Sequence, residues 1–358
     1  MVPPPLVDPE RILLIKLRHH GDVLLMTPVI SALKQRYPNA EIDVLIHEET
    51  VPILSRHPMI RHIWGLKRSL RGWQKLRHYF SLYRGLSSRR FDWVIHLSDQ
   101  WNGALLARFL HHEEAVGIAY PRRMNGKWEK CFTRLAERAA DNSVHAVEQN
   151  LLVLKPLGIE VEEQDKRCTM VLSQEDRDQA ERQLTSLGVG GEYIVIHPAA
   201  RWFFKCWEDD RFAQVIQSLA DEGWTIILTG APSEQEMRLV NSILSKVDSP
   251  RVHSLAGKLS LNSLAALIAE ARLFIGVDSA PMHMAAALQK DCIALFGPSK
   301  INEWHPWMTR YTLINAADFG PAVDPDSIDT GTEQRFLTSI PTEAVLQAAR
   351  QMLHPGIT

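Results

Sequence analysis

Short apolar runs alternate with helix-like stretches along almost the whole chain, and the pattern restarts near its middle. The runs typical of buried strands are residues 12–17, 42–46, 62–66, 93–97 and 115–118 in the first half, and 193–196, 225–228, 252–255, 273–277 and 292–295 in the second. Strands that alternate with helices form parallel sheets whose faces the helices cover. The sequence therefore predicts an α/β fold with two doubly wound parallel sheets.

The helices expected between these strands, together with the chain length, indicate two domains. We expect helices at 28–37 (capped by Thr27), 69–86, 145–157, 209–222, 233–246, 260–270, 282–288 and 342–353. A chain of 358 residues is too long for one ordinary core, and residues 158–166 are acidic and polar. We predict domains at 1–165 and 166–340, a loop at 318–333 and a closing helix at 341–358. A ligand is expected in the cleft between the carboxyl ends of the two sheets.

Composition narrows the class of protein. Hydrophobic residues make up 45% of the chain, charged residues 23%, and the net charge is −2, so a nucleic-acid partner is not expected. The four cysteines, Cys131, Cys168, Cys206 and Cys292, lie far apart and indicate reduced thiols in the cytosol, not disulfides or a zinc site. Residues 1–5 lack the apolar stretch of a signal peptide, and no run is long enough to span a membrane. We expect an intracellular, cytoplasmic protein, with binding to a membrane surface still open.

The turn after the run at 273–277 has the features of a diphosphate site. Asp278-Ser279-Ala280 follows the strand, and Pro281 opens an Ala-rich helix. Small residues let a ligand reach backbone N–H groups at the positive end of the helix dipole, and His283 in the first turn adds a donor. The alternative is that Asp278 or Ser279 only caps the helix and His283 is incidental.

Other loops that follow strands of the second half could complete such a site. Arg201 and Lys205 follow the strand at 193–196, and Lys205 could neutralise a departing diphosphate. The alternative, a solvated lysine, fits poorly with the Trp and Phe residues around it. Gly230 leaves the next strand, Glu234 could simply favour the dipole of its helix, and Gly257-Lys258-Leu259-Ser260 could cradle a nucleobase through backbone groups.

The first strand ends in Arg18-His19-His20-Gly21-Asp22. A GxGxxG turn is absent, which disfavours a nicotinamide cofactor. Gly21 would allow a sharp turn that places Asp22 at the mouth of the cleft, where its carboxylate could accept a proton from a substrate hydroxyl. The alternative is that Asp22 caps the turn that follows.

Two basic stretches suggest an anionic partner. Residues 67–90 contain no acidic residue, and aromatic side chains are interleaved with Lys67, Arg68, Arg71, Lys75, Arg77, Arg84, Arg89 and Arg90. A second group contains Arg122, Arg123, Lys127, Lys130 and Arg134 with Trp128. A membrane surface, a phosphorylated glycolipid or RNA would suit such stretches. The alternative is that they are solvated helix faces.

In combination these motifs resemble the lipopolysaccharide core heptosyltransferases, which use ADP-heptose and have the two-domain GT-B fold. The resemblance covers nearly the whole chain and rests on residues 12–16, Gly21-Asp22 to Thr27-Pro28, Lys205 with Trp207, 256–258, 276–280 with His283, and Phe296-Gly297-Pro298 with Trp304 and Trp307. Ser98-Asp99-Gln100-Trp101 and Phe204-Lys205-Cys206-Trp207 resemble the branch-adding members that attach the third heptose. The chain departs from the family at Ala199-Ala200, Pro232 and Ala280, where relatives carry Thr pairs, a donor-binding Glu and Gly.

The resemblance implies an inverting transfer from ADP-heptose to a lipid A–core glycolipid, without cofactor or metal, at the inner face of the inner membrane. It implies that Asp22 is the catalytic base and that Lys205 contacts the sugar-nucleotide phosphates. Donor-binding residues would be Gly21, Arg201, Gly230, Leu259, Asp278, Ser279, Ala280 and His283, and acceptor-binding residues Arg71, Lys75, Arg122 and Arg123. The resemblance also implies that the first domain binds the acceptor and the second the nucleotide sugar. Two other functions stay open: another nucleotide-sugar enzyme of this fold, such as an epimerase, and a non-enzymatic nucleotide-binding scaffold at a membrane.

Overall fold

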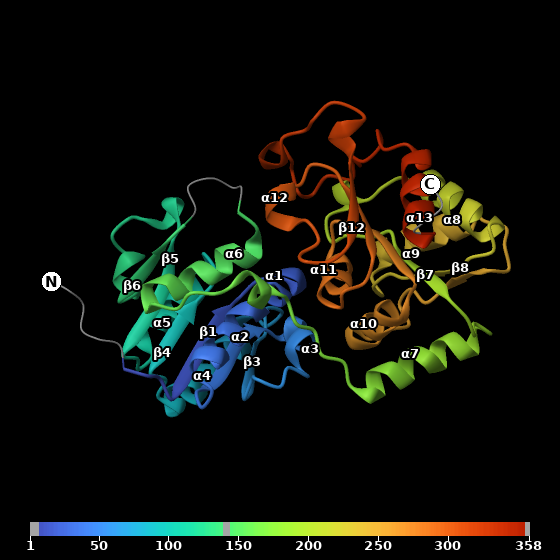
Figure 1. The fold of residues 1–358 in the computed structure, drawn as a ribbon. Coiled ribbons are helices and arrows are strands. Elements are labelled where there is room, and N and C mark those ends of the chain that lie inside the picture. Colours follow the sequence, from blue (N-terminus) through green and yellow to red (C-terminus); the bar gives the residue numbers. More distant parts are fainter. Residues whose placement is uncertain (1–6, 139–143, 355–358) are drawn as a thin grey trace. The chain divides into compact units, whose positions relative to one another are not determined.

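The computed structural model describes residues 7–138 and 144–354, which form two compact units (Figure 1). The division lies between Val171 and Leu172, whereas the predicted boundary is 165/166. The final helix α13 (Thr342–Leu353) packs on helix α8 (Asp209–Asp221) and belongs to the second unit. Residues 1–5 and the last residues of the predicted closing helix, 355–358, lie outside the described part of the chain.

The first unit is built on a parallel sheet in the order β3-β2-β1-β4-β5-β6. Its strands are β1 (Arg11–Lys16), β2 (Glu41–His47), β3 (His62–Leu66), β4 (Trp93–His96), β5 (Glu114–Ala119) and β6 (Arg134–Glu137). The helices are α1 (His20–Leu24), α2 (Thr27–Arg36), α3 (Val51–Leu54), α4 (Gly72–Arg89), α5 (Trp101–Phe109) and α6 (Ala146–Leu151). All five predicted strands are confirmed. The sixth, β6, was not predicted because an edge strand of sequence Arg-Leu-Ala-Glu, largely unburied, lacks an apolar run.

Two predictions about the bounds of helices in this unit are wrong. Thr27 does not cap α2: it is the first helical residue, its hydroxyl donates to the Leu24 carbonyl at 2.8 Å, and it accepts a bond from the Thr169 amide at 2.9 Å. The helix expected at 145–157 ends as an α-helix at Leu151 and continues as a 3₁₀ segment, Leu152–Leu157. Pro156 lies in that segment, and a proline cannot donate the hydrogen bond that a longer α-helix needs there.

The second unit repeats the same topology, in the order β12-β11-β10-β7-β8-β9. The strands are β7 (Tyr193–His197), β8 (Thr225–Leu228), β9 (Val252–Ser254), β10 (Leu273–Val277), β11 (Cys292–Phe296) and β12 (Tyr311–Asn315). Besides α8 and α13, the helices are α7 (Gln174–Ser186), α9 (Glu234–Leu244), α10 (Leu261–Glu270), α11 (Ala280–Ala287) and α12 (Ile301–Trp304). Three of these elements were not predicted: β12, α7 and the short helix α12. The signal for α7 was present, because Ser173 and Asp176 form a capping box at its start.

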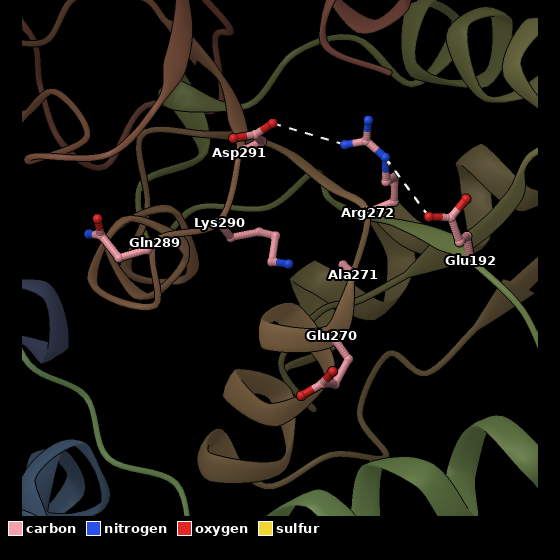
Figure 2. A pocket seen from close by; sticks show the side chains of 7 residues that line it. All are labelled: Glu192, Glu270, Ala271, Arg272, Gln289, Lys290 and Asp291. Atoms are coloured by element: carbon pink, nitrogen blue, oxygen red, sulfur yellow. Dashed lines mark ion pairs between the residues drawn. The ribbon is translucent and has the colours of Figure 1, made fainter. Parts of the chain in front are cut away.

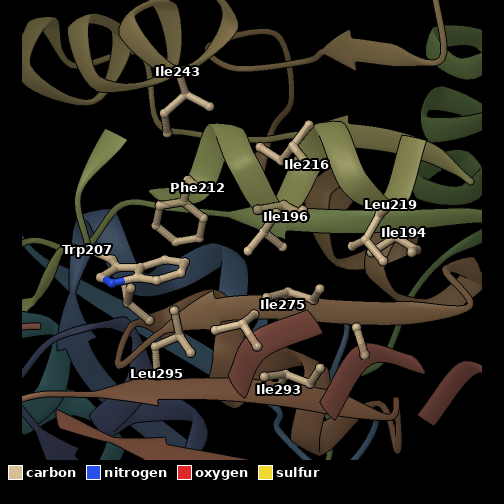
Figure 3. Close-up of a cluster of buried hydrophobic side chains, with 14 of the residues drawn as sticks. Ile194, Ile196, Trp207, Phe212, Ile216, Leu219, Ile243, Ile275, Ile293 and Leu295 are labelled. Atoms are coloured by element: carbon tan, nitrogen blue, oxygen red, sulfur yellow. The ribbon is translucent and has the colours of Figure 1, made fainter. Parts of the chain in front are cut away.

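The core of the second unit explains why its strands read as continuous apolar runs. Side chains of β7, β10 and β11 form one core with those of α8, α9 and α13. Figure 3 labels Ile194, Ile196, Trp207, Phe212, Ile216, Leu219, Ile243, Ile275, Ile293 and Leu295. The labelled side chains are all fully buried. Burial of each large side chain stabilises the fold by about 1.5–3 kcal/mol, and a strand covered on both faces needs apolar residues at every position.

Candidate active site

The strand order of each sheet fixes where a ligand site is expected. In each sheet the order in which successive strands are added reverses once, between β1 and β4 in the first unit and between β7 and β10 in the second. Loops leaving the carboxyl ends of two such strands diverge, and the crevice between them is where open α/β sheets bind ligands. Asp22 and Asp99 follow β1 and β4, while Lys205 and Asp278 follow β7 and β10. The predicted chemical residues therefore lie at the two switch points.

Asp22 lies in the short helix α1 and already has two partners. Its carboxylate accepts a hydrogen bond from the His19 amide at 3.3 Å and pairs with Arg18, Nε to Oδ1, at 3.4 Å. The side chain is 13% exposed. The expected sharp turn at Gly21 is wrong, because Gly21 is the second residue of α1. The alternative reading of Asp22 as a cap is thus part of its structural role, and its carboxylate still has lone pairs for a further donor.

Asp99, just after β4, gathers three arginines at the same switch point. Oδ1 lies 3.7 Å from Nη1 of Arg18, Oδ2 pairs with Arg122, and Arg123 donates through Nε to the Asp99 carbonyl at 3.0 Å. Burial alone would raise the pKa of Asp99, but the charges of Arg122 and Arg18 hold it below its usual range. Arg122 is 69% exposed, so it remains accessible to an anion. Asp99 appeared in the sequence only as part of a motif, because its partners lie far along the chain.

A buried lysine completes this group. Lys16, at the end of β1, donates from Nζ to the Leu97 carbonyl at 2.8 Å and to Oδ1 of Asn150 at 2.7 Å. Burial lowers its pKa to about 8, although the nearby Asp22 charge opposes that shift. Lys16 was not predicted as a site residue, because a lysine that ends a strand carries no motif of its own.

In the second unit the structure brings Lys205 and Asp278 together. Nζ of Lys205 lies 2.5 Å from Oδ2 of Asp278, and both side chains are nearly buried. The same ammonium lies 4.9 Å from the centre of the Trp202 ring. The alternative of a solvated lysine is therefore wrong. Arg201 is exposed on the same loop.

The turn from β10 into α11 contains a hydroxyl group that the helix does not use as a cap. Ser279 is the residue before the helix, but its side chain makes no capping hydrogen bond. Its hydroxyl oxygen is buried and, within residues 7–138 and 144–354, has no hydrogen-bond partner. Ala280 is the first helical residue, one before the predicted Pro281. His283 is buried one turn later, with its ring 6.3 Å from that of Trp304. The backbone N–H groups at the start of α11 and the Ser279 hydroxyl are therefore donors that can bind an anion.

The loops after β8 and β9 meet at two glycines. The amide of Gly257 donates to the Gly230 carbonyl at 2.8 Å, and Gly257 has φ +71°, a conformation that favours glycine. Glu236 closes this loop, since its carboxylate accepts from the Ala231 amide at 2.7 Å. Burial raises the pKa of Glu236. Leu259 is partly buried against the core.

Glutamates of α9 divide into two roles. Glu234 lies at the exposed start of the helix and pairs with Arg238 one turn on, at 2.5 Å. Glu236 instead turns back to the glycine loop. The sequence singled out Glu234 and missed Glu236, whose distinguishing feature is a bond to a backbone amide that only the folded loop supplies.

The basic stretch at 67–90 is partly neutralised. Lys67 pairs with Glu48 at 3.3 Å, Arg68 pairs with Glu49, and Arg89 pairs with Glu41 at 2.9 Å. Arg71 directly precedes α4 and Lys75 lies in its first turn. The helix follows the edge strand β3, two strands away from β1. With strands about 4.8 Å apart, the two residues lie beside the switch point and not in it.

A surface pocket lies at the amino ends of the strands of the second sheet, opposite the carboxyl ends that carry the switch point (Figure 2). Its lining residues Glu192, Arg272 and Asp291 immediately precede β7, β10 and β11. Arg272 lies 4.0 Å from both carboxylates. Since ligands of such sheets bind at carboxyl ends, this pocket is not the candidate site.

Comparison with known proteins gives a consistent result. A model of glycosyltransferase family 9 (heptosyltransferase) matches residues 79–327. Lipopolysaccharide heptosyltransferase 3 of Escherichia coli is 38% identical over 343 residues, which cover 96% of this chain and 99% of that relative. Among solved structures, a family 9 glycosyl transferase from Veillonella parvula has TM-score 0.82 at 22% identity, covering 96% of this chain and 97% of its own. The E. coli heptosyltransferase WaaC with ADP has TM-score 0.75 at 21% identity, covering 96% and 99%.

Proposed function

The chain belongs to glycosyltransferase family 9, the heptosyltransferases, and from this premise we propose how its residues carry out the transfer. The enzyme is a heptosyltransferase of the GT-B fold, and neither an epimerase nor a non-enzymatic scaffold. It moves a heptose from ADP-heptose to the inner core of lipopolysaccharide, and its likeness to heptosyltransferase 3 assigns it the third heptose.

The second unit binds the donor. The diphosphate lies at the start of α11, where the amides and the buried hydroxyl of Ser279 donate to it. Lys205 adds a positive charge. Asp278 would repel a diphosphate, so its role is to hold Lys205 in position through the 2.5 Å contact. The adenine lies along the backbone near Leu259, above the loop of Gly230 and Gly257.

The first unit supplies the base. Asp22 accepts the proton of the acceptor hydroxyl while that oxygen forms its bond to the anomeric carbon of the heptose. The bond from the anomeric carbon to the phosphate oxygen breaks, and ADP leaves with the bonding electrons. One displacement inverts the anomeric centre. Arg18 keeps the carboxylate in position at 3.4 Å.

The charge that develops on ADP is neutralised by protein groups, and we propose that no divalent ion takes part. Lys205 is a fixed ammonium, and the positive end of α11 is a fixed dipole. Both are in place before the reaction, so they stabilise the leaving group without reorganisation.

The acceptor is a lipid A–core glycolipid, bound through its phosphates. Arg122 and Arg123 contact Asp99, which also pairs with Arg18, the arginine bound to Asp22, so they lie close to the base. Arg71 and Lys75 would bind a part of the acceptor further from the reacting hydroxyl. No helix in the described ranges, 7–138 and 144–354, is long and apolar enough to cross a membrane. We propose that the enzyme works at the cytoplasmic face of the inner membrane.

The observation that carries this proposal is the Lys205–Asp278 pair beside the start of α11, at a switch point of the second sheet. To test the function, the full chain is incubated with ADP-heptose and a core acceptor that lacks the branch heptose. We expect ADP release that depends on acceptor, a mass gain of one heptose, and no loss of rate in EDTA. ADP release without a mass gain would contradict the transfer, and a rate abolished by EDTA would contradict the absence of a metal.

A further inference from the structure

The outward side of helix α4 carries an apolar stripe, which an exposed helix rarely shows. Trp73, Leu76, Phe80 and Tyr83 recur at intervals of three and four residues, so they form one stripe along the helix. They are 86%, 62%, 68% and 39% exposed. The opposite side packs on the core through Leu82 and Leu86. Four large side chains are therefore held in solvent where polar residues are usual.

The stripe continues onto the neighbouring helix. The hydroxyl of Tyr83 donates to the carbonyl of Phe109 at 3.1 Å, so the end of α5 lies against α4. Phe109 is 64% exposed and Leu105, one turn earlier, is 45% exposed. We call these six residues the α4 face. A contiguous apolar patch of this kind marks an interaction surface.

Positive charge accompanies the α4 face. At 100° per residue, Arg77 and Arg84 lie on the same side of α4 as Trp73 and Phe80. Lys75, Arg77 and Arg84 form no ion pair with any carboxylate among residues 7–138 and 144–354, and α4 contains no acidic residue. The carboxylates near the ends of the basic stretch are occupied by Lys67, Arg68 and Arg89.

We propose that the α4 face binds the surface of an anionic lipid bilayer. Trp73 inserts at the level of the headgroups, where its amphipathic ring is most stable, and Phe80 buries its apolar ring at the boundary with the acyl chains. Arg77 and Arg84 contact lipid phosphates. A second copy of the chain is a poorer occupant. A two-fold contact would set the arginines of one copy against those of the other, with no carboxylate on the face to pair with them. The inference does not depend on the identity of the donor or the base.

The test is flotation of the full chain, without substrates, with vesicles of phosphatidylethanolamine and phosphatidylglycerol, or of phosphatidylcholine alone. We expect binding to the anionic vesicles that weakens with salt. The double variants W73S/F80S and R77Q/R84Q should each lower the partition coefficient by at least about tenfold. F319S is the matched control, because Phe319 is 46% exposed in the second unit, and it should bind as the parent does.

Two further readouts keep the test decisive. The rate with a delipidated acceptor should be unchanged in W73S/F80S, which separates failure of membrane binding from failure of catalysis. Equal vesicle binding by the parent and both double variants would overturn the proposal. So would light scattering that shows a dimer dissociated by W73S/F80S, since the α4 face would then be a contact between copies.

Discussion

Asp22 combines a structural and a chemical role in one carboxylate. It accepts from the His19 amide at the start of α1 and pairs with Arg18, which also reaches Asp99. The two contacts hold the side chain in one orientation, as a base requires. They also mean that a test must remove the charge without removing the cap.

Asp22→Asn meets that condition, because the amide oxygen can still accept from His19. We expect a normal melting temperature and unchanged affinity for ADP, with turnover lower by about 10²–10⁴-fold, the usual contribution of a general base. Single-turnover kinetics and calorimetry with ADP measure the two quantities. Turnover within tenfold of the parent would remove the assignment of the base.

Lys205 is held by a carboxylate and an aromatic ring, so its position does not depend on the donor. Such a preorganised cation stabilises a leaving diphosphate more than a mobile one does.

Lys205→Met should weaken ADP binding and lower kcat, by about 10²-fold or more in kcat/KM. Lys290→Met is the matched control, since Lys290 lies at the amino ends of the strands of the same sheet, among the residues of Figure 2. Both are measured with the ADP-release assay. If the two variants lose the same activity, Lys205 has no special role.

At the scale of elements, α4 does two things along its length. Arg71, just before the helix, and Lys75, in its first turn, lie on the carboxyl side of the sheet after β3, while the outward side of the helix carries the α4 face. The helix forms despite this, because Leu82 and Leu86 anchor its opposite side in the core.

Charge reversal at the start of α4 tests acceptor binding. Arg71→Glu with Lys75→Glu should raise KM for a phosphorylated acceptor by about tenfold or more, with kcat little changed, because only ground-state binding is lost. Reversal of two surface charges in the second unit, Arg238 and Lys246, is the control. An unchanged KM for the acceptor would show that Arg71 and Lys75 are solvated and do not bind it.

At the scale of the whole molecule, both units use one strand order and bury histidines at or near their sheets. Burial lowers the pKa of His57, His96 and His197 to about 4. Between pH 6.5 and 4 the imidazoles of the unfolded chain take up protons while those of the folded chain stay neutral. The contribution of these histidines to the free energy of unfolding is therefore fully present above about pH 6.5 and is lost as the pH falls toward 4.

Urea midpoints should accordingly fall between pH 7.5 and 5. Within that window each histidine changes the unfolding equilibrium by up to about tenfold per pH unit. The variants His96→Gln and His197→Gln should show a flatter dependence over the same range. Identical slopes in parent and variants would show that other groups cause the loss.

The sequence by itself determined the fold class, ten of the twelve strands and the family. Apolar runs and their spacing are local properties, and two buried parallel sheets leave few other ways to cover them. It also predicted Lys205, in the loop after β7, and Asp278, directly after β10, as site residues. Predictions failed where neighbours outweighed local preference: Thr27 is helical, Gly21 lies inside α1, and Pro156 changes the type of helix.

Only the tertiary structure decided which predicted residues meet. Lys205 and Asp278 are 73 positions apart and touch because β7 and β10 are neighbours at a switch point. Asp99 meets Arg18 for the same reason in the first sheet and meets Arg122 from the loop after the neighbouring strand β5. Glu236 reaches a loop that periodicity does not reveal. Exposure, too, is decided by packing: nothing in the pattern of α4 shows that Trp73 and Phe80 remain outside the core. Contacts between distant segments depend on strand order, and a local pattern does not encode strand order.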